Sequence, residues 1–202
     1  MRLRLETEQD YFENVNVTRE AFWNVYRPGC DEHLLHQNLR NSPNYIKELC
    51  YVAEKDGRLV GNIVYAKMLK DGVPSDGVIG FGPLSVLPEM QKQGVGSALV
   101  KETLSKAKEI GFKAVLITGN PEYYQRFGFV SASRFGVRLP DIAEGDEAAF
   151  FMAAELEEGY LEKHAGVYDF DPFYAPDQKE LEEFEKQFPP KRKREPRPTD
   201  LA

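Results

Sequence analysis

The feature that most constrains the fold of this chain is a glycine-bearing turn, Gly94-Val95-Gly96, between an apolar strand and an amphipathic helix. The first backbone N–H groups of a helix have no partner within it, and the helix dipole adds partial positive charge at that end. Because glycine has no β-carbon, a ligand can approach the backbone closely there. The stretch from Pro83 to Val100 therefore indicates a site for a phosphate or pyrophosphate group.

The segment that follows this turn predicts a helix and then a buried strand. At about 100° per residue, one continuous helix face carries Leu99, Val100, Thr103, Leu104, Ala107 and Ile110. Gly111 stands where a glycine commonly ends a helix. Residues 114–117 are all apolar, which is typical of a strand covered on both faces, as in a parallel pair. The order strand, helix, strand predicts a right-handed βαβ unit.

The remaining elements predict an α+β fold. Alternation over residues 2–6 favours an edge strand, and apolar spacing favours helices from Thr7 to Tyr26 and from Asp31 to Asn41. Asp56-Gly57 joins two strands as a hairpin, and a short helix over 122–127 precedes two further antiparallel strands. We therefore expect a central, twisted, mixed and mostly antiparallel sheet with one parallel strand pair, flanked by helices.

Charge and composition limit the function classes. The net charge of −7 argues against a nucleic-acid-binding protein, which is usually basic, and weakly favours a cationic partner. The two cysteines, Cys30 and Cys50, have neither a disulfide framework nor the spacing of a metal site. The sequence shows no apolar signal core at its start and no run long enough to span a membrane. We expect a cytoplasmic protein without metal, acting as a monomer or a homodimer.

Three local motifs together resemble the GNAT superfamily of acyl-CoA N-acyltransferases. Gln91-Lys92-Gln93-Gly94-Val95-Gly96 is similar to the Arg/Gln-x-x-Gly-x-Gly/Ala loop of that family. Asn120 follows the apolar strand, and Tyr124-Gln125-Arg126-Phe127-Gly128-Phe129 is similar to the family's Tyr-x-x-x-Gly-Phe ending. A nucleotide-binding Walker loop is excluded because Gly-Lys-Ser/Thr is absent, and a dinucleotide fingerprint would need a third glycine.

The resemblance implies a site for acetyl-CoA as co-substrate. The residues expected to bind it are Leu84, Ser85, Val86, Gln91, Lys92, Gln93, Gly94, Val95, Gly96, Ser97, Asn120, Tyr123 and Phe127. Backbone N–H groups of the loop would hold the pyrophosphate, and the strand at Leu84 and Val86 would pair with the pantetheine amides. Simple core packing of Leu84 and Val86, and an N-cap role for Asn120, are alternatives compatible with these roles.

The resemblance also implies direct transfer of an acetyl group to a primary amine, small or peptidic. Tyr124 would be the catalytic acid that protonates the leaving thiolate, and its alternative role is aromatic packing. For the general base, Glu20, His33, His36 and Asp76 are candidates by region only, and an ordered water or an amine that arrives neutral is an alternative. The acceptor should lie near residues 7–41 and 140–146.

The resemblance covers about 1–154, so we expect a catalytic domain over residues 1–155. Residues 156–188 are expected to form an extension that packs on it or near it, and 189–202 a basic, proline-rich, disordered tail. Two other functions stay open at this point. One is a non-catalytic acyl-CoA sensor or regulatory module of the same fold, and the other is a phosphate-loop protein that binds nucleotides.

Overall fold

A computed structural model of the 202-residue chain describes residues 1–197. The strands are β1 (Arg2–Leu5), β2 (Tyr51–Lys55), β3 (Arg58–Lys70), β4 (Val73–Val86), β5 (Ala114–Thr118), β6 (Val130–Ser131), β7 (Val137–Arg138), β8 (Phe151–Glu155) and β9 (Gly166–Asp169). The α-helices are α1 (Tyr11–Phe22), α2 (Glu32–Leu39), α3 (Val95–Glu109), α4 (Pro121–Tyr124), α5 (Tyr160–Lys163) and α6 (Gln178–Glu185). None of these helices is both long and apolar enough to pass through a membrane.

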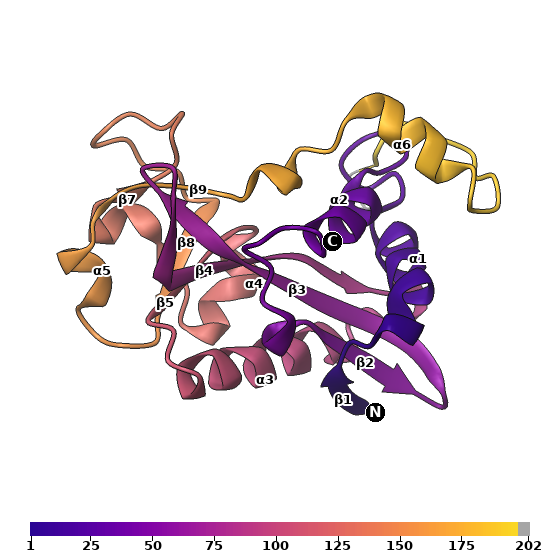
Figure 1. Cartoon of the computed structure of the whole chain (residues 1–202), viewed down its shortest axis with the longest axis horizontal. Helices are drawn as coiled ribbons and strands as arrows, with labels where there is room; N and C mark the ends of the chain where they lie inside the picture. Colours follow the sequence, from indigo (N-terminus) through magenta and orange to yellow (C-terminus); the bar gives the residue numbers. More distant parts are fainter. Residues whose placement is uncertain (198–202) are drawn as a thin grey trace.

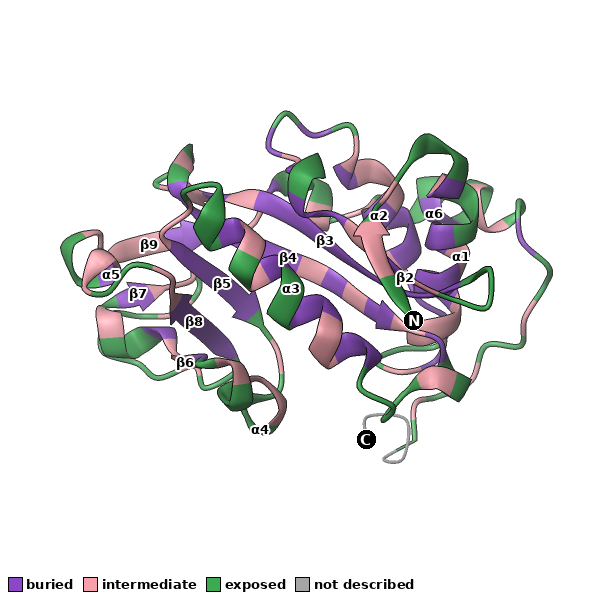
Figure 2. Ribbon diagram, turned by 90° about the horizontal axis from the view of Figure 1, so that it is seen from below, coloured by how far each residue is buried: buried purple, intermediate pink, exposed green. Residues whose placement is uncertain are grey.

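The centre of the molecule is one mixed sheet with the strand order β1-β2-β3-β4-β5-β8-β6 (Figure 1). Its neighbours are antiparallel except β4 and β5, where Val78 lies opposite Ala114 in a parallel ladder. The α+β prediction with one parallel pair in the central sheet is thereby confirmed. A further short parallel ladder joins β7 to β9 beside this path. The apolar run over 114–117 is fully buried, as expected for a strand with both faces covered (Figure 2).

An irregularity in β4 separates its second half from β5. Tyr65 of β3 pairs with Phe81, whereas Ile63 pairs with Leu84, so β4 has one residue more than β3 between these pairs. Such a bulge bends a strand and re-aims its side chains. The parallel ladder with β5 ends at Gly80. Residues 84–86 of β4 therefore continue beyond the part of the strand that pairs with β5.

Helices cover opposite faces of the sheet. A β-carbon on Gly61 would lie 3.0 Å from Val95 and 3.4 Å from Leu99 of α3, while the next residue, Asn62, donates to the carbonyl of Asn14 in α1. Successive residues of a strand point to opposite faces, so α1 and α3 lie on the two sides (Figure 1). This places the N-terminus of α3 and the C-terminal end of α1 at the same end of β4, where the candidate site lies.

One residue of the predicted α3 face is exposed. Leu99, Val100, Thr103 and Ala107 have no accessible surface, whereas Ile110 is 42% exposed. Ile110 is the C-cap, one residue beyond the last helical residue Glu109. The prediction that Ile110 belongs to the packed face is therefore wrong, because the helical period ends before it.

The segment 156–188 packs on the sheet and on α1. Its strand β9 pairs with the end of β3, with Leu69 opposite Asp169. Its helix α6 faces α1, where the buried Arg19 guanidinium forms an ion pair with Glu185 at 2.9 Å. The ring of Phe188 stacks on Phe12 with centroids 5.2 Å apart. The segment thus closes the outer side of α1.

The start of the basic, proline-rich end lies along α1. Lys191 forms an ion pair with Glu20 at 2.8 Å, and the carbonyl of Arg192 accepts a hydrogen bond from the indole of Trp23. These tertiary partners supply contacts that the local composition does not predict. The rest of the predicted tail, residues 198–202, lies outside the described residues.

Candidate active site

Two adjoining cavities lie where β4, α1, α3 and α4 meet. The first, here the loop cavity, has a volume of about 700 Å³ and is bounded by the glycine turn. The second, here the aromatic cavity, has a volume of about 800 Å³ and is bounded by Phe81, Phe150 and Phe170. The residues that line both are Phe22, Tyr26, Leu84, Tyr123 and Tyr124. The cavities therefore meet beside Tyr124.

The glycine turn presents backbone N–H groups to the loop cavity. Gly94 is the N-cap of α3 in the left-handed conformation, with φ of 84°, and no side chain caps the helix. Ala98 donates the first helical hydrogen bond, to the carbonyl of Gly94. The N–H groups of residues 95–97 precede it, so helix geometry provides them with no acceptor inside α3. This is the arrangement that binds an anion at a helix N-terminus.

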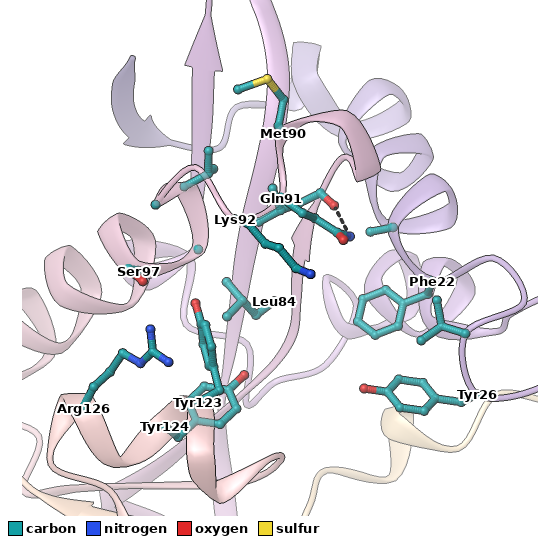
Figure 3. Close-up of a pocket in the computed structure, with 16 residues that line it drawn as sticks. Phe22, Tyr26, Leu84, Met90, Gln91, Lys92, Ser97, Tyr123, Tyr124 and Arg126 are labelled. Carbon is teal, nitrogen blue, oxygen red and sulfur yellow. Dashed lines mark hydrogen bonds between the residues drawn. The ribbon is translucent and has the colours of Figure 1, made fainter. Parts of the chain in front are cut away.

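A side chain at position 96 would displace the Tyr123 hydroxyl. A β-carbon there would lie 2.8 Å from the hydroxyl of Tyr123, closer than side chains normally approach. Two cations complete this cavity, since Lys92 and Arg126 line it from opposite sides (Figure 3). The Arg126 guanidinium lies 4.9 Å from the centre of the Tyr123 ring. The loop cavity therefore combines unpaired N–H groups with positive charge, which suits an anionic ligand.

The two glutamine side chains of the loop bond to nearby carbonyls. Gln91 donates to the carbonyl of Val86 at 3.1 Å, and Gln93 donates to that of Glu89 at 2.8 Å. Gln91 lines the loop cavity, whereas Gln93 is not among the residues that line either one. Their side chains hold the loop against the preceding turn in this structure.

Side chains of β4 alternate between the site and the core. Leu84 and Val86 face α3, since a β-carbon on Gly96 would lie 3.9 Å and 3.5 Å from them. Ser85 points the other way, is fully buried and donates to the hydroxyl of Thr18 at 3.1 Å. Of these three predicted residues, Leu84 and Val86 thus line the loop cavity, and Ser85 lines neither cavity.

Tyr124 lies at the junction of the cavities. Its ring is packed edge-on against Tyr123 and Phe129, with centroids 4.9 and 5.8 Å apart. Burial raises the pKa of the Tyr124 phenol above its usual value, and the neighbouring Tyr123 and Tyr26 raise it further. Gly119 is what leaves room for this ring, because a β-carbon there would lie 2.4 Å from its Cε2 atom. The phenol therefore keeps its proton at neutral pH in a position open to both cavities.

The other residues of the motif after β5 have structural contacts. Asn120 is the N-cap of α4, and its side chain accepts a hydrogen bond from the N–H of Glu122 at 2.9 Å. Asn120 also lines the aromatic cavity. Phe127 packs 5.6 Å from the Tyr123 ring and lines neither cavity. For Asn120 the capping alternative is observed, and it leaves the residue at the cavity wall.

None of the four residues considered as general base lines either cavity. Glu20 is paired with Lys191, and Asp76 extends into solvent beside Lys67. The two histidines are fully buried on α2, with His33 against Glu185 and His36 bonded to Thr18. The two histidines and Glu20 thus have contacts around α1 and α2, and Asp76 lies on the surface, so none of the four is positioned in the site.

Several lining residues were not found from the sequence. They are Ala21, Phe22, Val25, Tyr26, Glu32, Leu35, Phe81, Gly82, Pro83, Met90, Thr118, Gly119, Arg126, Phe150, Phe170 and Tyr174. Six of them come from α1, from α2 and from the C-terminal extension, far from the glycine turn in the chain. The available signal was the aromatic content of 12%, with several rings after residue 149, but no spacing rule connects those rings to the turn. Within residues 1–197 no group of three His, Cys, Asp or Glu side chains is placed to hold a metal ion.

A family model described as acetyltransferase (GNAT) domain matches residues 47–131, which include β4, the glycine turn, α3 and Tyr124. Among curated proteins, the uncharacterized N-acetyltransferase YhbS of Escherichia coli K12 is 32% identical over 97 residues, which cover 48% of this chain and 56% of YhbS. The match thus spans about half the length of that relative.

Two solved structures have the same fold over most of the chain. The structure of Escherichia coli YhbS in complex with CoA has a TM-score of 0.75 and 25% identity, and covers 86% of this chain and 91% of that one. A GNAT family acetyltransferase from Brucella melitensis in complex with acetyl-CoA has a TM-score of 0.68 and 27% identity, with coverage of 86% and 97%.

Proposed function

Because this chain belongs to the GNAT superfamily, we propose that it transfers the acetyl group of acetyl-CoA directly to a primary amine. The observation that carries the proposal is the meeting of the two cavities at Tyr124. An anion-binding loop on one side and a separate cavity on the other suit a reaction between two ligands. The neighbours of known structure that hold CoA or acetyl-CoA support the choice of co-substrate.

The loop cavity has the features that acetyl-CoA requires. The N–H groups at the start of α3 would bind the pyrophosphate, and the exposed side chains of Lys92 and Arg126 would add charge. The backbone of residues 84–86, which extends past the end of the ladder with β5, would pair with the pantetheine amides as an added strand would. Any β-carbon at position 96 would narrow this passage.

In the transfer step, the neutral amine nitrogen forms a bond to the acetyl carbon. The tetrahedral oxyanion then collapses, the C–S bond breaks, and the sulfur takes a proton from the Tyr124 hydroxyl. Burial raises the pKa of this phenol, so the hydroxyl still carries its proton when the sulfur leaves. An acceptor that binds as an ammonium gives one proton to solvent water before the attack, and its nitrogen gives a second proton to water afterwards. Water returns a proton to the Tyr124 phenolate, and the products are an amide and CoA with a free thiol.

The proposal is tested by measuring acetyl-CoA binding by calorimetry and thiol release with a panel of primary amines. We expect Tyr124→Phe to lower kcat by roughly 10²–10⁴-fold, the usual range for loss of a general acid, with little change in stability. Tyr51→Phe on β2, which lines neither cavity, serves as the matched control and should keep the wild-type kcat. Tight binding of acetyl-CoA without thiol release on any amine would instead identify an acyl-CoA sensor. Binding of nucleotides but not of CoA would exclude both the acetyltransferase and the sensor.

A further inference from the structure

The two cavities carry opposite charge. Lys92 and Arg126 line the loop cavity, and none of the described residues that line it is a carboxylate. Glu32 lines the aromatic cavity, and none of the described residues that line it is a lysine, an arginine or a histidine. Cavities of opposite sign favour ligands of opposite charge. The aromatic cavity is thus electrostatically suited to a cation.

The walls of the aromatic cavity are mostly apolar. Eight of its sixteen lining residues are phenylalanine or tyrosine. They come from α1 and its end, from β4, from α4, and from the segments before β8 and after β9. Phe150 is 49% exposed and Tyr26 is 63% exposed, although each lines this cavity. Aromatic faces bind apolar groups by burial of surface and attract cations through their quadrupole.

Glu32 is available for a ligand. It is the first residue of α2, and its Oε2 atom accepts a hydrogen bond from the N–H of Asp31 at 3.1 Å. The nearest cation in sequence, Arg27, pairs with Asp31 at 2.5 Å. No described residue forms an ion pair with Glu32. Burial raises the pKa of this carboxyl, which reflects an environment where a charge is poorly solvated. A ligand ammonium would supply the missing counter-charge.

We propose that the acceptor is a primary amine carried on an apolar body of about the size of an aromatic ring, with its ammonium bound by Glu32. This inference rests on the proposed acetyl transfer and adds the class of acceptor to it. Polyamines carry further ammonium groups that the apolar walls would leave without a counter-charge, and amino sugars carry hydroxyl groups that the rings would leave without hydrogen bonds. Neutral aromatic compounds have the surface but no charge for Glu32.

The test is calorimetric binding to the full chain in the presence of saturating CoA. The probes are 2-phenylethylamine, its uncharged analogue 2-phenylethanol, and spermidine. We expect the amine to bind at least about tenfold more tightly than either of the other two, the effect of one charge-assisted contact added to ring burial. Equal binding of the alcohol, tighter binding of spermidine, or no binding of 2-phenylethylamine would overturn the inference.

Variants separate the two parts of the recognition. Glu32→Gln should weaken 2-phenylethylamine by roughly tenfold or more and bring it close to the alcohol, while acetyl-CoA affinity stays unchanged. Glu102→Gln on an exposed turn of α3 changes the net charge by the same amount, and it should change neither the affinity for 2-phenylethylamine nor that for acetyl-CoA. Phe150→Ala, at an exposed ring, should weaken the amine and the alcohol alike. Full affinity of Glu32→Gln for the amine would contradict the role of Glu32.

Failure of this inference differs from failure of the proposed function. Acetyl transfer that prefers spermidine would leave the enzyme assignment intact and remove the acceptor class. Selective binding of 2-phenylethylamine with no thiol release would support the acceptor class but contradict the proposed acetyl transfer, because the cavity would then bind the amine without catalysing a reaction.

Discussion

The substitution Gly119→Ala should damage catalysis through the position of one ring. Gly119 follows β5 and lies under Tyr124, and its backbone conformation is one that alanine also adopts. The added β-carbon would lie 2.4 Å from Cε2 and 2.9 Å from Cδ2 of Tyr124. Carbon atoms in contact prefer about 3.5–4.0 Å. The ring edge must therefore move by about 1 Å.

This displacement sets the expected magnitudes. Forcing an extra methyl group into packed surroundings costs about 1–3 kcal/mol, which for a chain of this length lowers Tm by several degrees. A misplacement of about 1 Å at a reacting group costs roughly hundredfold in rate, equivalent to about 2.7 kcal/mol of transition-state stabilisation. We therefore expect kcat to fall about hundredfold while the KM for acetyl-CoA changes little, because the glycine turn itself is untouched.

The assay is a double-mutant cycle on kcat with Gly119→Ala, Tyr124→Phe and the combination of both. If the alanine acts by moving the hydroxyl, it should add little in the Tyr124→Phe background, where no hydroxyl is left to move. Thermal unfolding of each variant shows how much of the loss comes from stability. A kcat within threefold of wild type for Gly119→Ala, or full additivity with Tyr124→Phe, would refute the reasoning.

Two further outcomes follow from the charges of the structure. We expect Lys92→Met and Arg126→Met each to raise the KM for acetyl-CoA by about threefold to tenfold, because both side chains are exposed, and we expect a smaller increase at high salt. The control Lys101→Met, on the outer side of α3, should leave this KM unchanged. An equal increase in KM for Lys101→Met would contradict a local role of the two cations. Burial lowers the pKa of His33 and of His36 to about 4, from 6.5 in the unfolded chain. As the pH falls, the histidines of the unfolded chain therefore bind protons before those of the folded protein, so the urea concentration at the midpoint of unfolding should decrease between about pH 6.5 and pH 4. This decrease should be less steep in His36→Gln than in the wild type. Equal slopes of midpoint against pH in the two proteins would contradict this linkage.

The parts of the fold that could be predicted from the sequence are those that depend on patterns of neighbouring residues. The glycine turn, the helix after it and the apolar run at 114–117 lie within 25 residues, and their periods and caps are properties of neighbouring residues. The parallel pair of β4 and β5 followed from that unit. The helical period did not, however, show where α3 ends, so Ile110 was assigned to the wrong environment. The domain boundaries, the oligomeric state and the cytoplasmic location stay predictions.

The parts of the site that the sequence did not predict depend on contacts between distant segments. Phe22 and Phe170 reach one cavity from distant segments of the chain, and neither belongs to a motif recognised in the sequence. Glu32 reads as an ordinary first-turn acid of a helix. Lys191 of the basic end pairs with Glu20 on α1, a contact that the composition of that end does not predict. Only tertiary packing brings such residues together.

The opposite charges of the two cavities also bear on how a reaction cycle would end. Acetylation turns an ammonium into a neutral amide, so the product would keep its contacts with the rings but lose its attraction to Glu32. CoA keeps every phosphate and would stay bound to the turn, Lys92 and Arg126. The amide should therefore dissociate before CoA. In product-inhibition kinetics, CoA should then be a stronger inhibitor than the amide. The charge pattern that selects the substrates would thereby also set the order in which the products depart.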